Sequence, residues 1–131
     1  MPRGIGNNNP GNIRHGDQWQ GLCSRQTDQS FCQFIAPEYG IRAMIKILRN
    51  YVKLYDDRTI RQFISRWAPP SENDTESYIT YVSRSVGIDS CAVIDVNDQR
   101  VMTVLVKAMI QMENGQQPYS PETFERAFEL L

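Results

Sequence analysis

Residues 99–115 read QRVMTVLVKAMIQMENG, and apolar side chains lie on almost every side of the helix that this stretch predicts. Because a helix that is apolar nearly all round must be surrounded by protein, we expect it at the centre of a small helical domain. Asn97 or Asp98 is a suitable N-cap, and Gly115 suits the left-handed residue that ends a helix. Glu113 then stands in the last turn, where the helix dipole disfavours a negative charge. This acid is either a solvated last residue or a group held there for chemistry.

Four further helices are predicted elsewhere in the chain. Each combines apolar residues at helical spacing with a residue suited to a helix start or end. They are residues 37–55, Thr59–Trp67, a helix from Asn73 or Asp74 to Gly87, and one that starts at Ser120–Pro121. The predicted fold class is therefore mainly α, with about five helices.

The first third of the chain, residues 1–36, lacks helical periodicity and is rich in Gly, Asn, Asp and Gln. Turn-forming residues at 27–30, between aromatic positions, predict a small β-hairpin or an irregular loop. Cys23 and Cys32 flank this turn, and they either form a disulfide across it or remain reduced thiols. We expect one domain over residues 1–131, with an Asn/Gly-rich arm and hairpin before a helical core.

Composition argues against several classes of partner. Fourteen basic and fifteen acidic residues leave a net charge near zero, so no global field favours nucleic acid or an anionic membrane. No apolar run is long enough to span a bilayer, and the polar start MPRGIGNNNPGN is unlike a secretory signal. We therefore expect a soluble product made in the cytoplasm. His15 and the cysteines lack the spacing of zinc ligands, so neither a metal nor a cofactor is expected.

Two stretches, NNNPGNIR and RWAPPSENDTESYITYV, combine amides with aromatic or proline residues. Such loops suit neutral, hydroxyl- or acetamido-bearing ligands, which need neutral donors and acceptors beside a flat apolar face. The alternative is that the first stretch is a turn-forming arm and the second a capped connection between helices. The side chains that would wall a sugar groove are Asn8, Asn12, Arg14, Trp19, Asn73 and Tyr78.

The motifs NNNPGNIR, PEYGIRA, WAPPSENDT and MENGQQPY resemble those of a family of small phage virion-associated proteins, whose relatives occur in prophages and beside secretion systems. A more distant similarity connects the chain to bacterial glucosaminidases of the lysozyme superfamily. It depends on the order of five features: Asn8 to Arg14, Trp19–Gly21, Phe31–Phe34, the helix from Tyr39, and NDTESYI. These resemblances imply a lysozyme-like fold and an activity on peptidoglycan.

The glucosaminidases carry their catalytic Glu on a helix that precedes the Asn-rich turn, and this chain has too few residues before Asn7 for such a helix. The helix that ends in Glu–Asn–Gly offers a match, so we hypothesise that the catalytic helix has moved from the front of the sequence to the back. Glu113 would be the general acid, and burial of Met109, Ile110 and Met112 would favour its protonated form.

Glycosidases commonly use a second carboxylate. Asp28, at the expected hairpin tip, is our preferred second acid, ahead of Asp17. Without a second acid, the domain could be a lytic transglycosylase, in which the sugar 6-hydroxyl attacks. Glu38 is the rival of Glu113, but it lies in the first turn of a helix, where the dipole favours the charged form.

Three functions stay open at this point. The first is a peptidoglycan hydrolase that cleaves glycan strands, and the second is a non-enzymatic virion or glycan-binding module. The third is an antibacterial effector with the same chemistry, which an immunity protein would inhibit by plugging its cleft. An active form would work in the periplasm or cell wall after delivery by a virion or a secretion system.

Overall fold

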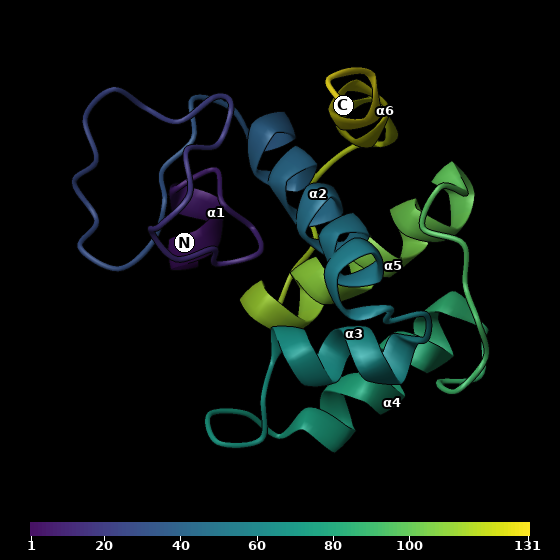
Figure 1. Ribbon diagram of the computed structural model, residues 1–131. Coiled ribbons are helices and arrows are strands. Elements are labelled where there is room, and N and C mark those ends of the chain that lie inside the picture. Colours follow the sequence, from purple (N-terminus) through teal and green to yellow (C-terminus); the bar gives the residue numbers. More distant parts are fainter. The chain divides into compact units, whose positions relative to one another are not determined.

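Six helices account for the regular structure of the chain, and the computed structural model describes residues 1–131 (Figure 1). In chain order they are α1 (Arg3–Gly6), α2 (Pro37–Tyr55), α3 (Ile60–Trp67), α4 (Thr75–Val86), α5 (Gln99–Asn114) and α6 (Pro121–Glu129). The predicted mainly α fold class is confirmed, and all five predicted helices are present. The short α1 is additional, because four residues that include two glycines carry no periodic pattern.

Side chains at the helix ends explain why the predicted boundaries hold. The N-caps of α3, α4 and α6 each accept a hydrogen bond from a backbone N–H of the first turn, and they are Thr59, Asp74 and Ser120. Asp98 accepts from two backbone amides in the first turn of α5. Gly87 and Gly115, with φ of 76° and 73°, follow the last residues of α4 and α5.

The chain forms two compact units, which we call unit 1 (residues 1–46 and 109–131) and unit 2 (residues 47–108). Helices α2 and α5 contribute residues to both units. Within unit 2, α3 packs against α4. The segment after α4 pairs with the start of α3 through an antiparallel bridge between Thr59 and Val93.

The arm of unit 1, residues 7–36, is irregular and contains isolated bridges instead of strands. Antiparallel bridges join Arg14 to Phe31 and Leu22 to Phe34. Cys23 lies opposite Gln33, whose carbonyl accepts from the Cys23 N–H at 2.9 Å. All three cysteines are free thiols. The structure therefore has reduced thiols, the second of the two alternatives for Cys23 and Cys32.

A glycine of α2 allows the arm to lie close to that helix. A Cβ on Gly40 would collide with the backbone carbonyl oxygen of Asn8. Asn8 adopts a left-handed conformation (φ 53°), and its side-chain amide donates to the carbonyl of Phe34 at 3.0 Å. The Asn8 side chain therefore fixes the arm, which is one of the roles that the sequence left open for this stretch.

The prediction that the apolar side chains near the end of α5 are buried holds for two of the three residues. Met109 and Ile110 are fully buried, whereas Met112 is 37% exposed. The prediction that Met112 shields Glu113 from water is therefore wrong. A helix that ends at the surface turns one side outward in its last turn, and Met112 lies on that side.

Replacing Gly40 by Ala tests the close approach of the arm to α2. In a free helix this change stabilises by about 1 kcal/mol. Here we expect a net loss of about 1–3 kcal/mol, since the Asn8 carbonyl belongs to the backbone and must move with its neighbours. The free energy of unfolding in urea measures it. Gly87→Ala is the control. Its Cβ would have no atom within 4 Å, so we expect only the loss of stability that a left-handed alanine causes, about 1 kcal/mol. A gain in stability for Gly40→Ala would contradict this packing.

Candidate functional site

The Asn-rich arm meets the end of α5 through two consecutive residues of that helix. The side-chain amide of Asn12 donates to Oε1 of Glu113 at 3.2 Å, across 101 residues of sequence. The amide of Asn114 donates to the carbonyl of Pro10 at 2.8 Å and to that of Ile110 at 3.0 Å. All of these residues belong to unit 1. The helix end that carries the candidate acid is thus bonded to the arm at two points.

Asn9 shapes the turn that directs Asn12 toward Glu113. Its fully buried side chain donates to the carbonyls of Ile13 and Cys32, both at 2.9 Å, and accepts from the N–H of Ile13 at 3.0 Å. Asn12 itself is left-handed, with φ 51°. Asn adopts this conformation more readily than most residues, so the run of asparagines makes a tight turn at low cost.

Helix α1 closes one side of this contact. The side-chain oxygens of Asn12 and Asn114 each lie 2.7 Å from the point where a Cβ on Gly4 would stand. Both oxygens are buried, and neither has a hydrogen-bond partner. We call Gly4, Asn12, Glu113 and Asn114 the amide cluster. Only glycine fits at the first of these positions without moving the two amides.

Glu113 is half-buried in this cluster. The turn before it supplies the fully buried Met109 and Ile110. Its carboxyl group accepts from the neutral amide of Asn12, and part of the side chain is exposed. A carboxyl group in such surroundings, with part of its surface open, can exchange a proton with a bound molecule.

Asp28, our preferred second acid, is bonded to α1 and to other residues of the arm. It accepts from Arg3 through two nitrogens at 2.6 and 2.7 Å, and from the amide of Asn7 at 3.0 Å. The backbone N–H groups of Ser30 and Phe31 also donate to it. The Arg3 guanidinium, followed by these other donors, holds the pKa of Asp28 well below its usual range. These contacts favour a structural role, and its catalytic role stays a prediction.

The other predicted residues of unit 1 lie in varied settings. Arg14 is exposed, with its guanidinium 4.9 Å from the centre of the Phe31 ring. Trp19 is half-buried and lines a cavity. Glu38, the rival acid, is half-buried in the first turn of α2. None of these three residues belongs to the amide cluster.

Asn73 and Tyr78 belong to unit 2. Asn73 is exposed, and its amide donates to the carbonyl of Pro69 at 3.2 Å. Tyr78 is only 4% exposed, so it offers little surface to a ligand. Their part in a sugar groove stays a prediction.

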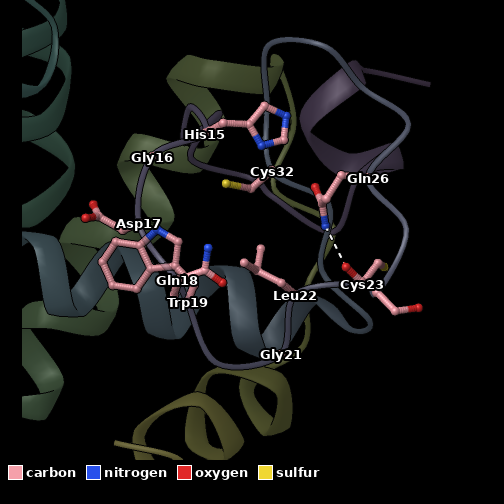
Figure 2. Close-up of a pocket in the computed structure, with 11 residues that line it drawn as sticks. His15, Gly16, Asp17, Gln18, Trp19, Gly21, Leu22, Cys23, Gln26 and Cys32 are labelled. Atoms are coloured by element: carbon pink, nitrogen blue, oxygen red, sulfur yellow. Dashed lines mark hydrogen bonds between the residues drawn. The ribbon is translucent and has the colours of Figure 1, made fainter.

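The cavity beside Trp19 has a volume of about 520 Å³ and lies in the arm (Figure 2). Most of its wall comes from residues 15–24, with Gln26 and Cys32 completing it. The indole Nε1 of Trp19 is buried and has no hydrogen-bond partner. Neither Glu113 nor Asn12 lines this cavity, so unit 1 holds two distinct polar features.

Three important positions were missed by sequence reasoning, namely Gly4, Asn9 and Asn114. Asn9 stands within the stretch that the sequence singled out, but its side chain binds backbone groups. Asn114 follows Glu113 directly, and an amide beside a candidate acid was a usable signal. Gly4 had no signal, because its role depends on which side chains come within 3 Å of it in space.

Comparison with known proteins gives one relative of clear similarity. No protein-family model matches the sequence. Protein P5 of Pseudoalteromonas phage PM2 is 42% identical over 131 aligned positions, which cover 97% of this chain and 80% of the phage protein. The chain belongs to the family of this phage protein.

Two further observations concern metal-binding clusters and membrane-spanning helices. No cluster of three or more His, Cys, Asp or Glu side chains is placed to hold a metal ion. No helix combines the length and apolar character that a membrane crossing needs.

Gly4→Ala tests the tight packing of the amide cluster. The new methyl group would stand 2.7 Å from two side-chain oxygens and 2.8 Å from the carbonyl of Asn9, so we expect a loss of about 1–3 kcal/mol. Gly6→Ala is the matched control in the same helix, since its nearest neighbour would be the Met1 sulfur at 3.7 Å. It should be neutral or stabilising by up to about 1 kcal/mol. Equal stabilities of the two variants in thermal melts would show that the cluster is loosely packed.

Asp28→Asn tests the ion pair with Arg3 through its pH dependence. Because the folded pKa of Asp28 is lowered, the pair stabilises fully above the ordinary value of about 4, and this contribution disappears as the pH falls toward the lowered value. The variant should therefore be less stable than the wild type at neutral pH, and the difference should shrink at about pH 2–3. Urea unfolding at both pH values measures it, with the exposed Glu125→Gln as control. A difference that grows in acid would refute the assignment.

Proposed function

We propose that this P5-family protein cleaves the glycan backbone of peptidoglycan, with Glu113 as the general acid. The observation that carries the proposal is the hydrogen bond from Asn12 to Glu113 at 3.2 Å. It brings together the two features that the sequence singled out independently, the acid at the end of the apolar helix and the Asn-rich arm. A solvated last residue, the plain alternative for Glu113, has no need of such a contact.

The surroundings of Glu113 suit a neutral polymer such as a glycan strand. Its neighbours in the amide cluster are two asparagine side chains, which bear no charge. Glu113 lies in the last turn of α5, at the C-terminal end of that helix. The rival Glu38 lies at the opposite kind of helix end, in the first turn of α2.

In the proposed step, the Glu113 carboxyl group gives its proton to the glycosidic oxygen while the bond from that oxygen to the anomeric carbon breaks. The departing sugar leaves with a new hydroxyl group, and positive charge develops at the anomeric carbon. Water or the sugar's own 6-hydroxyl then bonds to that carbon. The attacking group returns its proton to the Glu113 carboxylate, so the acid is restored.

Contacts of Asp28 favour a mechanism with a single acid. Five donors from Arg3, Asn7, Ser30 and Phe31 surround its carboxylate, so it is poorly available as a nucleophile or base. Glycan cleavage can proceed with one carboxylate if the substrate supplies the second group, as its acetamido or 6-hydroxyl. We therefore favour lytic transglycosylation or substrate-assisted hydrolysis over a two-carboxylate mechanism.

The phage relative supports a setting for this activity. The relative is a protein of phage PM2, which is consistent with delivery by a virion, or by a secretion apparatus of similar origin, to the cell wall of a bacterium. Peptidoglycan strands would be its substrate there. If it is a secreted effector, an immunity protein that blocks the cleft would protect the producing cell.

A non-enzymatic phage component that binds glycan is the second candidate. The use of Asn8, Asn9 and Asp28 to fix the arm favours it, because those side chains serve the fold and leave fewer groups for catalysis. In that case the contact between Asn12 and Glu113 would only attach the arm to α5.

Glu113→Gln separates these candidates. Glutamine keeps the shape and still accepts from Asn12, but it cannot donate a proton as an acid does. We expect release of soluble fragments from peptidoglycan sacculi to fall at least about 100-fold. Mass spectrometry of the fragments identifies the bond, since transglycosylation leaves an anhydro end that is lighter by one water than a hydrolysed end.

Two matched variants complete this experiment. Glu125→Gln, on the exposed side of α6, should cleave like the wild type, and Glu38→Gln should retain most activity. Thermal melts establish that each variant is folded. Full activity of Glu113→Gln would mean that another residue is the general acid. A wild-type protein without activity would favour the non-enzymatic component that binds glycan.

A further inference from the structure

Asn114, whose side-chain amide joins α5 to the arm, is followed directly by Gly115. No other asparagine of the chain precedes a glycine. An Asn–Gly pair deamidates more readily than other pairs, because glycine has no side chain to hinder attack by its backbone nitrogen on the side chain of the asparagine. The pair also lies at a helix end, where the backbone opens most easily. The junction between α5 and the arm therefore contains the asparagine whose sequence context is the most reactive.

Hydrogen bonds hold this pair in an unreactive arrangement in the folded protein. The Asn114 side-chain amide donates to the carbonyls of Pro10 at 2.8 Å and Ile110 at 3.0 Å. The N–H of Gly115 donates to the carbonyl of Gln111 at 2.8 Å, and the helical conformation of Asn114 keeps the Gly115 nitrogen away from the side-chain carbon. Deamidation brings that nitrogen to the side-chain carbon and removes the side-chain nitrogen. The last turn of α5 must therefore unwind, and both bonds of the Asn114 amide must be lost.

Deamidation would replace the donor at this junction by a charged acceptor. A carboxylate at position 114 has no N–H for the carbonyls of Pro10 and Ile110, and its negative charge would face both of them. The side-chain oxygens of Asn12 and Asn114 are already buried without a hydrogen-bond partner, so acceptors outnumber donors at this point. Because burying a charged acceptor without a donor is costly, the arm would not bind again in the same place.

We propose that Asn114–Gly115 is a deamidation site, that opening of the amide cluster sets its rate, and that the product keeps the arm detached from α5. The backbone nitrogen of Gly115 loses its proton and forms a bond to Cγ of Asn114, and the side-chain nitrogen leaves with that proton as ammonia. Water then opens the succinimide ring at either of its two carbonyl carbons, which gives aspartate or isoaspartate. Water is the only co-reactant, and neither step depends on the cleavage of glycan.

Peptide mapping by mass spectrometry measures this reaction in the whole protein. In mildly alkaline buffer with urea, which unfolds the chain, the peptide that contains Asn114 should deamidate at least about tenfold faster than in the same buffer without urea. Gly4→Ala crowds the side chains of Asn12 and Asn114, so it should speed the reaction of the folded protein at least about fivefold. Gly6→Ala, whose Cβ would meet only the Met1 sulfur at 3.7 Å, should react at the wild-type rate.

Gly87→Ala separates local opening from unfolding of the whole chain. Gly87 lies in unit 2, and its replacement lowers stability without touching the amide cluster, so the rate at Asn114 should stay near the wild-type value. Equal acceleration by Gly87→Ala and Gly4→Ala would show that the reaction follows global unfolding, which overturns control by the cluster. Equal rates with and without urea would overturn it as well. If Gly4→Ala does not fold, Asn12→Ala takes its place, because it removes the other amide of the cluster.

Asn114→Asp reproduces the charge of the product and tests its effect on the arm. The N–H of Asn12 donates to the carbonyl of Asn9 at 3.0 Å, and in this variant we expect it to exchange hydrogen at least about tenfold faster than in the wild type. Asn114→Ala loses the same donor without gaining a charge, so the exchange should rise less. Exchange in Asn114→Asp that is no faster than in Asn114→Ala would show that the charge does not detach the arm, and would overturn that part of the proposal.

Discussion

The attachment of the Asn-rich arm to the last turn of α5 is the constraint on which the candidate site depends. Two side-chain amides span it, from Asn12 to Glu113 and from Asn114 to Pro10. A single exposed hydrogen bond adds only about 1 kcal/mol, which would not hold a loop in place. Here both contacts are part-buried. Losing either one would leave polar groups without a hydrogen-bond partner and shielded from water, which costs more free energy than losing an exposed hydrogen bond. Gly4 tightens the arrangement further, because the absence of its side chain lets both amide oxygens approach α1.

Many polar side chains of the arm form hydrogen bonds that fix the conformation of the arm itself. These side chains are therefore not available to bind a ligand. Asn8 and Asn9 bind backbone carbonyls, and Asp28 collects donors from Arg3, Asn7 and its own turn. An irregular segment without a ladder must satisfy its backbone in this way. The Trp19 N–H and the Asn12 side-chain oxygen are exceptions in the arm, since both are buried and have no hydrogen-bond partner. The amide content of the loop is therefore a poor guide to ligands, because Asn8 and Asn9 bind backbone groups.

The helices could be predicted from sequence because their signals are local. Apolar spacing and caps such as Asp74 and Gly87 act within a few residues, and these two caps are confirmed. Long-range facts could not be predicted in this way. The outward position of Met112 depends on where α5 ends relative to the surface, and whether Cys23 and Cys32 pair depends on how the irregular arm folds. Asp28 accepts from the backbone N–H groups of Ser30 and Phe31, but its partner Arg3, 25 residues earlier, carried no pattern that pointed to it. Of the candidate site, the sequence indicated Glu113 and the arm separately, and the bond between them required the fold.

A hydrogen bond between an arm and a helix end does not depend on which of the two comes first in the chain. This is the physical reason why a catalytic helix at the back of the sequence is a workable arrangement. The hydrogen bond from Asn12 to Glu113 joins residues that are far apart in the sequence. It requires only that both segments pack in the same unit, as they do in unit 1. What the order of segments changes is the entropy of closing the loop between them, which grows only slowly with length, by roughly 0.6 kcal/mol per doubling. The many contacts of the buried core outweigh so small a term, so the same chemical arrangement can be reached from either order of the segments.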